Sequence, residues 1–425
     1  MAEAFSITAA ELVSLGKNAI PPQLRSTEHL VYSSPATLAF NSPGAQGFGV
    51  KRAGLAVPES VMLLVAPACC GRNTSALGAE SSLADRFFYL LQDEADIVTG
   101  RHLTQIPQAV QEVVASCQKR PSAVMLCITC VDALLGTDVE AVCRKASEAA
   151  GLPVVPCFMY ALTREGRLPP MVSVRKSIYS LLKPTPRRKD AVNLLGYFSP
   201  LQEDCELPAL LRSVGLQTVK ELSRCADFAE FQEMSRANFN LVLHPEVRVA
   251  ADDLHQRLGI PSIELTRVYD LEKVRHQYEA LANAIGVTFK FATYYSRARD
   301  AVEAFHAACP EAVFAVGEWC NADPFELTLS LLRYGFRVSD LYGTVSTASF
   351  VYLRKIAELS PNTRIFSNLS PTMLVYHGSP DATHAIGNDA AFYNPNRPAV
   401  SWADEPQPFG FAAIEHLFRN LLALL

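Results

Sequence analysis

Short apolar runs rich in β-branched residues alternate with amphipathic stretches along most of this chain of 425 residues. This alternation is typical of βαβ units, in which helices connect parallel strands. Strands that are covered on both faces have unbroken apolar runs, and residues 61–65 (VMLLV) form such a run. The pattern therefore predicts an α/β fold with parallel sheets.

Three α/β units are expected after a polar N-terminal arm of residues 1–45. They are residues 46–185, 190–287 and 288–425, and the basic, proline-containing segment 182–190 is typical of a linker. The predicted strands are residues 61–65, 95–100, 123–128, 154–158, 191–196, 218–222, 239–243, 260–263, 312–316, 337–341, 364–367 and 373–376. The predicted helices include residues 106–117, 206–214, 228–236, 270–285, 323–334, 346–359 and 411–425, with a polar, proline-bearing stretch at 377–408. Each unit is thus predicted to be Rossmann-like, with a doubly wound parallel sheet.

Composition and charge exclude several classes of protein. The chain is 49% apolar and only 19% charged, against about a quarter in an average domain, which excludes disorder as the main state. Its 38 basic and 43 acidic side chains give a net charge of −5 without basic blocks, so nucleic acid and anionic membranes are not expected partners. No apolar run approaches the roughly 18 residues of a membrane span, and the N-terminus lacks signal-peptide features. We expect a soluble, cytoplasmic protein.

The chain has 11 cysteines, an odd number. In a reducing cytosol they are buried thiols, reactive thiols or metal ligands rather than a disulfide framework. Cys69 and Cys70 follow the strand at 61–65, and Cys130 follows the strand at 123–128. If these strands are neighbours in one parallel sheet, the three thiols meet at its carboxyl edge, which suits an iron–sulfur cluster or zinc.

Small residues after Cys70 add to this hypothesis. Gly71 lets backbone amides approach a cluster, and Asn73 and Thr74 are placed to add hydrogen bonds. The alternative is that the thiols are small buried hydrophobes, since cysteine is among the most buried residue types. That alternative is favoured for the cysteines inside predicted helices or strands, which are Cys117, Cys127, Cys143, Cys157, Cys225 and Cys309.

Other catalytic motifs are absent from the sequence. It has no P-loop pattern, no GxSxG or HExxH motif, and no dinucleotide fingerprint after a predicted strand. Any dependence on ATP therefore requires a second protein.

Several segments together resemble component 1 of the nitrogenase superfamily, which includes nitrogenase α and β subunits, cofactor scaffolds, and protochlorophyllide and nickel-tetrapyrrole reductases. Residues 66–71 (APACCG) resemble the strand–GPxxCG cluster loop, with Cys70 in the cysteine position. Residues 94–100 (EADIVTG) resemble the segment that follows, and 129–139 (TCVDALLGTDV) resemble the next cluster stretch, with Cys130 as ligand. The similarity continues at residues 192–196 (VNLLG), 239–243 (FNLVL), 258–261 (LGIP), 401–402 (SW) and 409–411 (FGF).

The resemblance implies three Rossmann-like domains around a central cleft and a cluster held between two homologous subunits. It also implies a separate ATP-dependent iron–sulfur reductase that supplies electrons. Nitrogenase subunits carry an earlier cysteine at about the place of residues 40–44, whereas this chain has none before Cys69. We therefore expect a 4Fe–4S cluster shared across a dimer interface, with Cys69 as a replacement ligand, rather than a larger P-cluster-like cluster.

Two further positions depart from nitrogenase α. The cysteine that binds the active-site cofactor corresponds to His244 here, and the histidine ligand corresponds to Val400. Dinitrogen reduction by this chain alone is thus not expected. His244 at a strand end is a candidate ligand or proton donor, and a structural histidine is the alternative. Cys320, beside Trp319, is a weaker candidate, and His377 and His384 are expected to be solvated loop residues.

Three functions remain open from the sequence. The first is a nitrogenase-like reductase subunit that takes electrons from the ATP-dependent partner and reduces a cleft-bound substrate. The second is a non-catalytic β-like subunit or a metallocluster assembly scaffold, paired with a homologous subunit or with itself. The third is a metal-free set of binding domains with buried thiols. The sequence does not identify the substrate.

Overall fold

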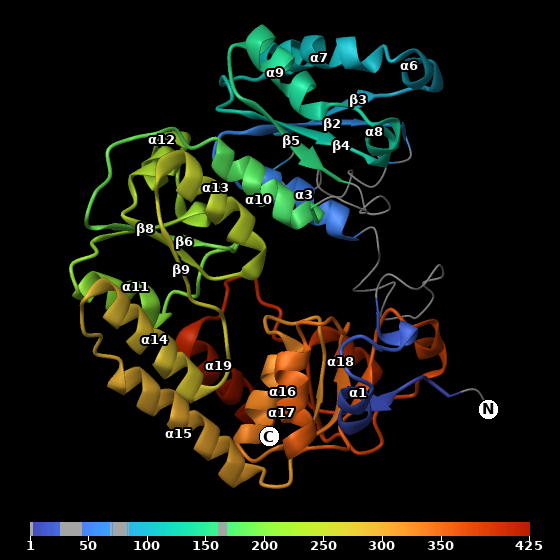
Figure 1. The fold of residues 1–425 in the computed structure, drawn as a ribbon, viewed down its shortest axis with the longest axis vertical. Helices are drawn as coiled ribbons and strands as arrows, with labels where there is room; N and C mark the ends of the chain where they lie inside the picture. Colours follow the sequence, from blue (N-terminus) through green and yellow to red (C-terminus); the bar gives the residue numbers. More distant parts are fainter. Residues whose placement is uncertain (1–2, 26–44, 69, 71–82, 84, 160–167) are drawn as a thin grey trace. The chain divides into compact units, whose positions relative to one another are not determined.

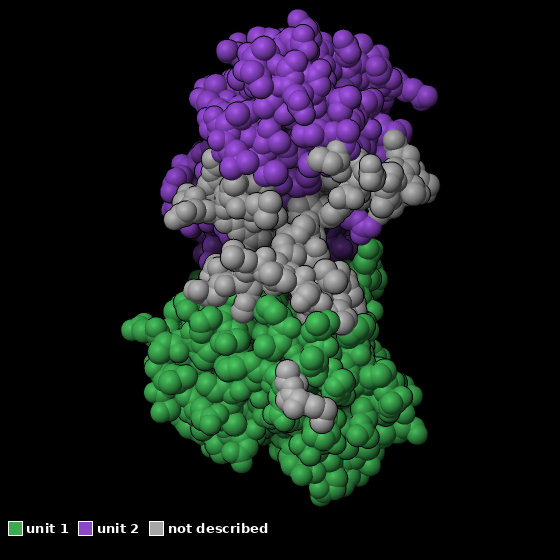
Figure 2. All heavy atoms as spheres, turned by 90° about the vertical axis from the view of Figure 1, so that its right-hand side faces the viewer, with its two compact units in different colours: residues 1–42, 201–215, 267–425 green, residues 43–200, 216–266 purple. Residues whose placement is uncertain are grey.

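The computed structural model describes residues 3–25, 45–68, 70, 83, 85–159 and 168–425. The chain divides into two compact units, coloured separately in Figure 2. Unit 1 contains Met1–Ser42, Leu201–Gly215 and Arg267–Leu425, and unit 2 contains Pro43–Pro200 and Leu216–Thr266. In the described part of the chain, no helix is both long and apolar enough to span a bilayer.

The first sheet of unit 2 is parallel and has the strand order β3-β2-β4-β5. Its strands are β2 (Val61–Ala66), β3 (Phe87–Leu91), β4 (Val124–Ile128) and β5 (Val154–Phe158). The first strand of the chain segment, β2, lies between the second and the third, so the winding direction reverses between β2 and β4. Such a reversal is the topological switch point of a doubly wound sheet.

Helices cover both faces of this sheet (Figure 1). The helices are α3 (Ala45–Gly54), α6 (Glu94–Thr99), α7 (His102–Ser116), α8 (Cys130–Leu135), α9 (Val139–Ala150) and α10 (Pro170–Ser180). The apolar side chains of α7 and α9 pack on one face, and those of α3 and α10 pack on the other. All residues of β2 and β4 are buried as a result, which explains their unbroken apolar runs.

The second sheet of unit 2 repeats this arrangement with the order β7-β6-β8-β9. Its elements are β6 (Ala191–Leu195), β7 (Thr218–Glu221), α12 (Phe228–Gln232), β8 (Phe239–Val242), α13 (Arg248–Leu258) and β9 (Ser262–Glu264). Its switch point lies between β6 and β8. Residues 182–188, within the expected linker, have no helix or strand.

Unit 1 contains one sheet with the order β1-β12-β11-β10-β13-β14. Its strands are β1 (Ile7–Thr8), β10 (Val313–Val316), β11 (Arg337–Tyr342), β12 (Arg364–Phe366), β13 (His384–Ile386) and β14 (Ala399–Val400). Only β1 runs antiparallel to its neighbour. The switch point lies between β10 and β13. The helices of unit 1 are α1 (Ala9–Leu15), α11 (Glu206–Ser213), α14 (Leu271–Ile285), α15 (Ala292–Ala308), α16 (Pro324–Arg333), α17 (Phe350–Leu359), α18 (Asn388–Tyr393) and α19 (Gly410–Leu422).

The structure confirms the α/β class with parallel sheets, but two predicted strands are wrong. Residues 95–100 lie in helix α6 and its cap, because the Asp93 and Asp96 side chains form a capping box and Gly100 ends the helix with φ 68°. Residues 373–376 lie in and just after a short 3₁₀-helix, Pro371–Val375. The stretch 377–408 contains β13, α18 and β14, whose strands of two or three residues are too short to give a periodic signal.

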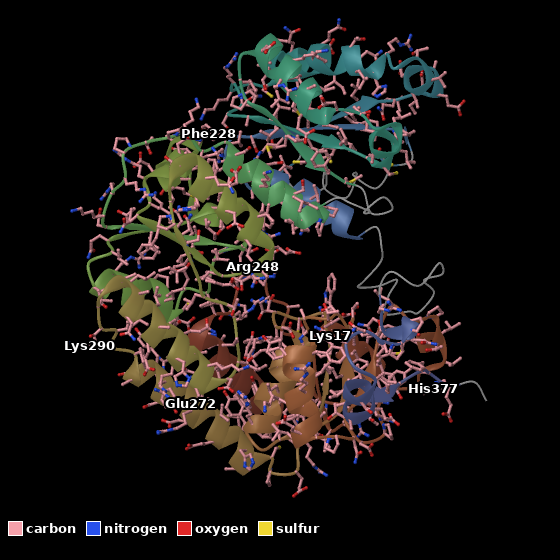
Figure 3. All side chains as sticks on the ribbon, in the orientation of Figure 1. Lys17, Phe228, Arg248, Glu272, Lys290 and His377 are labelled. Carbon is pink, nitrogen blue, oxygen red and sulfur yellow. The ribbon has the colours of Figure 1, made fainter. Side chains whose placement is uncertain are left out.

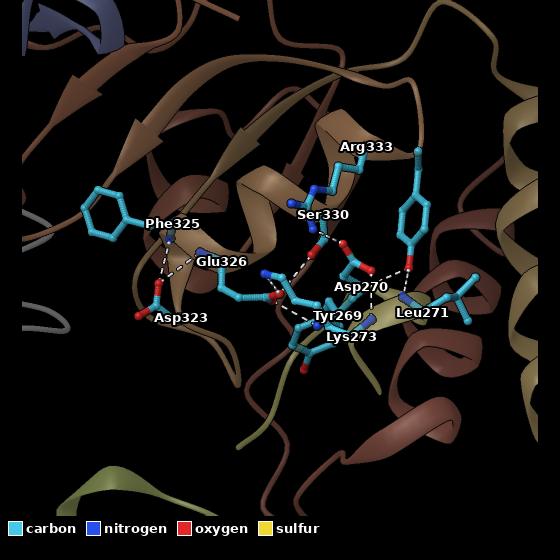
Figure 4. Close-up of polar contacts among 10 residues, drawn as sticks. Tyr269, Asp270, Leu271, Lys273, Asp323, Phe325, Glu326, Ser330 and Arg333 are labelled. Carbon is cyan, nitrogen blue, oxygen red and sulfur yellow. Dashed lines mark hydrogen bonds and ion pairs between the residues drawn. The ribbon is translucent and has the colours of Figure 1, made fainter. Parts of the chain in front are cut away.

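A buried carboxylate joins α14 to α16 in unit 1 (Figure 4). Glu326 accepts hydrogen bonds from the Tyr269 backbone N–H (2.9 Å) and the Ser330 hydroxyl (3.1 Å), and it pairs with Lys273 (3.3 Å). Asp323 caps the same helix by accepting from the backbone N–H groups of Phe325 and Glu326. The start of α14 is therefore held by polar contacts that are largely shielded from water.

A second buried carboxylate holds the last helix of the chain. Glu206 of α11 accepts hydrogen bonds from the backbone N–H groups of Phe411 (2.6 Å) and Ala412 (3.1 Å) at the start of α19, and from the Tyr278 hydroxyl (2.7 Å). Gly410 is required there, because a Cβ would lie 2.0 Å from the Glu206 carboxylate and its φ is 68°. Glu206 thus fastens the separate segment Leu201–Gly215 to the rest of unit 1.

We predict that Glu206→Ala lowers the free energy of unfolding by about 3 kcal/mol or more, because it leaves three buried donors without an acceptor. Urea denaturation of the full chain measures the loss. Glu279→Ala is the matched control, since Glu279 forms a surface ion pair with Arg275, and such a pair contributes about 1 kcal/mol or less. Equal losses in the two variants would contradict the prediction.

Candidate functional site

Cys70 and Cys130 lie beyond the carboxyl ends of two adjacent parallel strands. Val65 of β2 pairs with Ile128 of β4. The N–H of Cys70 donates a hydrogen bond to the Pro67 carbonyl in the turn that follows β2. Cys130 is the first residue of α8. The prediction that these strands are neighbours is confirmed, and the edge is the switch point of the sheet. The other predicted residues of this loop, Cys69, Gly71, Asn73 and Thr74, lie outside the described residues.

The cysteines of the described chain are all free thiols and differ in burial. Cys70 and Cys130 are half-buried, as are Cys117, Cys225, Cys309 and Cys320. Cys127 of β4 and Cys157 of β5 are fully buried side by side, and burial raises the pKa of the Cys157 thiol well above its ordinary value. Burial also raises the pKa of Cys143 to about 12, that of Cys225 to about 11 and that of Cys320 to about 12. These last four thiols stay protonated at neutral pH and are poor metal ligands.

Three buried polar residues surround the same edge. Gln92 follows β3, and its N–H donates to the carbonyl of Ala66, the last residue of β2 (3.0 Å). Thr129 precedes Cys130, and Asp132 lies in α8. Their exposed fractions are 3%, 1% and 1%. The amide N and O of Gln92, the Thr129 hydroxyl and one Asp132 oxygen have no hydrogen-bond partner among the described residues. A buried polar group that stays without a partner costs about 1–3 kcal/mol.

A buried histidine connects the helices around this edge. His102 Nδ1 lies 3.1 Å from the backbone carbonyl of Asp96 in α6, and its Nε2 lies 3.1 Å from Oδ1 of Asp132 in α8. A carbonyl oxygen only accepts, so Nδ1 is the donor in the first of these contacts. The pair fixes α6, the start of α7 and α8 against one another. The sequence reasoning missed it, because His102 and Asp132 are thirty residues apart.

Exposed apolar side chains flank the same edge. Leu91 at the end of β3, Val98 on α6, and Leu134 and Leu135 on α8 have exposed fractions of 53%, 85%, 74% and 50%. We call these four residues the α6–α8 apolar patch. All four lie at the end of, or after, strands that end at this edge, and exposed apolar side chains that form a contiguous patch are typical of surfaces that bind another protein.

His244 lies at the switch point of the second sheet of unit 2, two residues after the end of β8. Its ring packs edge-on against Tyr197, with the ring centroids 5.6 Å apart. Its Nδ1 accepts a hydrogen bond from the Glu246 backbone N–H at 3.3 Å. Gly196, which follows β6, has φ 142°, and a Cβ there would lie 2.8 Å from the Cβ of His244. The two loops at this switch point are therefore in close contact.

Arg175 of α10 holds both loops of this switch point. The guanidinium is buried, and its Nε and Nη2 donate to the Gly196 carbonyl at 3.0 and 2.9 Å. Its Nη1 pairs with the Glu246 carboxylate at 2.7 Å, and the group lies 4.5 Å above the Phe198 ring. The position of His244 thus depends on a residue of the preceding helix that the sequence reasoning did not identify.

The switch point of unit 1 carries two carboxyl groups that the sequence reasoning also missed, the half-buried Glu318 and the buried Asp389. Asp389 accepts from the backbone N–H groups of Glu318 (3.0 Å) and Trp319 (3.1 Å). The Asn368 amide donates to both carboxyls, at 3.0 Å to Glu318 and 2.6 Å to Asp389. Burial and the Asp389 charge raise the pKa of Glu318, and burial raises that of Asp389. Gly317 is required, because a Cβ would lie 1.9 Å from an Asp389 oxygen.

The two histidines expected to be solvated loop residues, His377 and His384, differ in exposure. His377 is exposed, as predicted (Figure 3). The prediction for His384 is wrong, because this residue lies in β13 and is buried against Phe305 and Phe314, where burial lowers the pKa of its ring. Val400 ends β14 and is buried.

No group of three histidine, cysteine, aspartate or glutamate side chains is arranged to hold a metal ion within the described ranges. Cys70 and Cys130 therefore belong to no such group within these ranges, and their role as cluster ligands stays a prediction.

Comparisons with known proteins identify the family that this chain matches. The family model for nitrogenase component 1 type oxidoreductases matches residues 45–350. The nitrogenase iron-molybdenum cofactor biosynthesis protein NifE of Klebsiella pneumoniae is 29% identical over 212 residues, which are 46% of this chain and 46% of that protein. NifE of Rhizobium meliloti is 30% identical over 176 residues, or 40% of this chain and 37% of that protein. The chain spans about half the length of the curated relatives it matches.

Solved structures resemble this chain over nearly its whole length. A structure of nitrogenase Cp1 at pH 6.5 has a TM-score of 0.69 and 14% identity, and it covers 96% of each chain. A structure of nitrogenase Cp1 at pH 5 has a TM-score of 0.65 and 15% identity, over 98% of this chain and 92% of that chain. At this level of identity the likeness establishes the fold.

The Glu318–Asp389 pair predicts a pH dependence of stability. Because the folded pKa of Glu318 is raised above its ordinary value of 4.5, its contribution to stability is complete below that pH and is lost as pH rises. Glu318→Gln should therefore give a shallower decline of unfolding free energy as the pH rises above 4.5.

Urea denaturation at a series of pH values measures this slope independently of any change in absolute stability. Glu311→Gln is the control, because Glu311 is exposed on the surface of the same unit. A Glu318→Gln slope that equals the wild-type slope would show that Glu318 does not contribute.

Proposed function

Because the chain belongs to the nitrogenase component 1 type oxidoreductase family, we propose that it binds an iron–sulfur cluster and acts as a metallocluster assembly scaffold. The observation that carries the proposal is the pair of half-buried thiols, Cys70 and Cys130, at the switch point of one parallel sheet. The curated relatives support the scaffold role, since they are named as cofactor biosynthesis proteins.

The proposed ligands are Cys70 and Cys130, with Cys69 as a third. Gly71, Asn73 and Thr74 are proposed to lie around the cluster. The buried polar groups of Gln92 and Thr129 fit such a group, because sulfide and thiolate sulfur atoms accept the hydrogen bonds that these donors lack among the described residues. A 4Fe–4S cluster is the simplest occupant, and a larger P-cluster-like cluster is the alternative. Such a cluster stores and passes on single electrons.

The cluster site is proposed to be shared with a second subunit. The described residues supply two thiols where a cluster needs about four ligands, and the α6–α8 apolar patch beside them is exposed. A homologous subunit or a second copy of this chain would cover that patch and add ligands. Both requirements are then met by one interface.

His244 and Val400 support the scaffold role over dinitrogen reduction. At His244 the nitrogenase α resemblance implies a thiolate, which is a strong ligand for iron. An imidazole whose Nδ1 accepts a backbone N–H has its remaining proton on Nε2 when neutral, so Nε2 is a donor rather than a metal ligand. A site of this kind holds a metal cofactor weakly, as a protein that passes its cargo on requires.

The same observation favours a second candidate function. A histidine that presents Nε2–H at a switch point is placed to donate a hydrogen bond or a proton to a bound substrate. The chain would then be a nitrogenase-like reductase subunit that receives electrons from an ATP-dependent iron–sulfur reductase. His244 would be its catalytic residue.

We predict that the anaerobically purified and reconstituted protein contains iron and acid-labile sulfide and gives an EPR signal after reduction with dithionite. Cys70→Ala and Cys130→Ala should lose most of the iron and the signal, because each removes a ligand. Cys117→Ala is the matched control and should keep both, since Cys117 ends α7 away from the carboxyl edge. Protein that stays free of iron after reconstitution would rule out the cluster.

The scaffold and reductase roles predict different behaviour of the loaded protein. A scaffold should activate a cofactor-free nitrogenase component 1 in a single transfer, with iron lost from the donor in proportion. A reductase should instead turn over repeatedly with ATP and an iron–sulfur reductase, and His244→Ala should slow it by about 100-fold or more. Repeated turnover without transfer would contradict the scaffold proposal.

A further inference from the structure

We propose that Gln92 and Thr129 donate hydrogen bonds to the sulfur atoms of the cluster bound at Cys70 and Cys130, and that these bonds raise its reduction potential. This inference rests on the proposed function above. It assigns a role to two residues that carry no metal-binding chemistry of their own.

The first argument is their place in the sheet. Gln92 and Thr129 each follow the last residue of a strand, β3 and β4, and these strands lie on either side of β2. The Gln92 N–H donates to the carbonyl of Ala66, which begins the connection to Cys70. Thr129 is the chain neighbour of Cys130. The two side chains therefore belong to the same edge as the two thiols.

The second argument is that their polar groups are buried and lack partners. Gln92 and Thr129 are 97% and 99% buried, from exposed fractions of 3% and 1%. Neither the Gln92 amide nor the Thr129 hydroxyl has a hydrogen-bond partner among the described residues. Thr129 is at the cap position of α8, yet its side chain makes no capping hydrogen bond. Two donors buried at one edge without a partner in the described part of the chain point to an acceptor there.

The third argument is the kind of acceptor that fits. Amide N–H and hydroxyl groups are donors. One oxygen of Asp132 pairs with His102, and the other, which has no partner among the described residues, is a competing acceptor. Thiolate and sulfide atoms are acceptors that carry negative charge, and that charge increases when the cluster takes up an electron. Hydrogen bonds to sulfur thus stabilise the reduced state more than the oxidised state, so their loss lowers the potential. A buried water is the alternative occupant.

The test is an EPR-monitored redox titration of the full-length, cluster-loaded protein, with its partner subunit if the complex is needed for loading. Gln92→Leu and Thr129→Val should each shift the midpoint potential to more negative values. Thr129→Ser keeps the hydroxyl and should stay close to wild type. Gln111→Leu is the matched control for Gln92→Leu, because the Gln111 amide is exposed and donates to the Ala149 carbonyl.

Each outcome of this titration decides the proposal. Unchanged midpoint potentials in Gln92→Leu and Thr129→Val, with wild-type iron content, overturn it and favour a buried water. If Gln92→Leu takes up no cluster, the comparison of Thr129→Val with Thr129→Ser decides alone. A wild-type protein without a cluster overturns this inference together with the proposed function, whereas a cluster that Cys70→Ala abolishes but whose potential these variants leave unchanged overturns this inference only.

A spectroscopic measurement separates a hydrogen bond to sulfur from a merely structural effect. The reduced cluster should show ENDOR couplings to exchangeable protons that disappear in deuterated buffer. Thr129→Val should lose one such coupling and Thr129→Ser should keep it. Couplings that are identical in wild type and Thr129→Val would overturn the role of Thr129.

Discussion

The arrangement of this protein depends on one topological constraint that is repeated three times. In each sheet the first parallel strand, β2, β6 or β10, has the second parallel strand (β3, β7 or β11) on one side and a later strand (β4, β8 or β13) on the other. Because parallel strands end at the same edge, the loops that follow the first strand and that later strand lie next to each other there. Gly196 lies against His244 and Gly317 lies against Asp389 in this way, and Cys70 and Cys130 follow the paired strands β2 and β4. The order of the strands, rather than proximity in sequence, brings these residues close to their neighbours.

Buried polar residues hold these meeting points together, and each uses a different chemistry. His102 links α6 to Asp132 at the first sheet, Arg175 links Gly196 to Glu246 at the second, and Asn368 links Glu318 to Asp389 at the third. Loops at strand ends expose backbone groups that no neighbouring strand satisfies. A buried side chain with several donors or acceptors supplies the missing partners and fixes the loop without a large apolar core.

The sequence predicted those parts of the fold that depend on local pattern. The runs at β2 and β4 are unbroken because both faces of the sheet are covered, so their ends, and hence the edge with Cys70 and Cys130, could be located. Helix α6 was mistaken for a strand because its Ile97, Val98 and Thr99 are β-branched, whereas the Asp93 capping box decides its conformation. The link between His102 and Asp132, and that between Glu318 and Asp389, could not be predicted, because they join segments 30 and 71 residues apart by a single side chain.

The three switch points differ in how complete they are, and this difference bears on function. At the second, Arg175 donates through all three guanidinium nitrogens, and at the third both oxygens of Asp389 accept hydrogen bonds. At the first, by contrast, donors of Gln92 and Thr129 are buried without partners among the described residues, and the α6–α8 apolar patch is exposed beside them. An anionic group would accept the hydrogen bonds of these donors, and a second subunit would cover the patch. A cluster bound between two chains supplies both at once, and a site that is complete only after assembly is what a protein that loads and passes on a metal cluster requires.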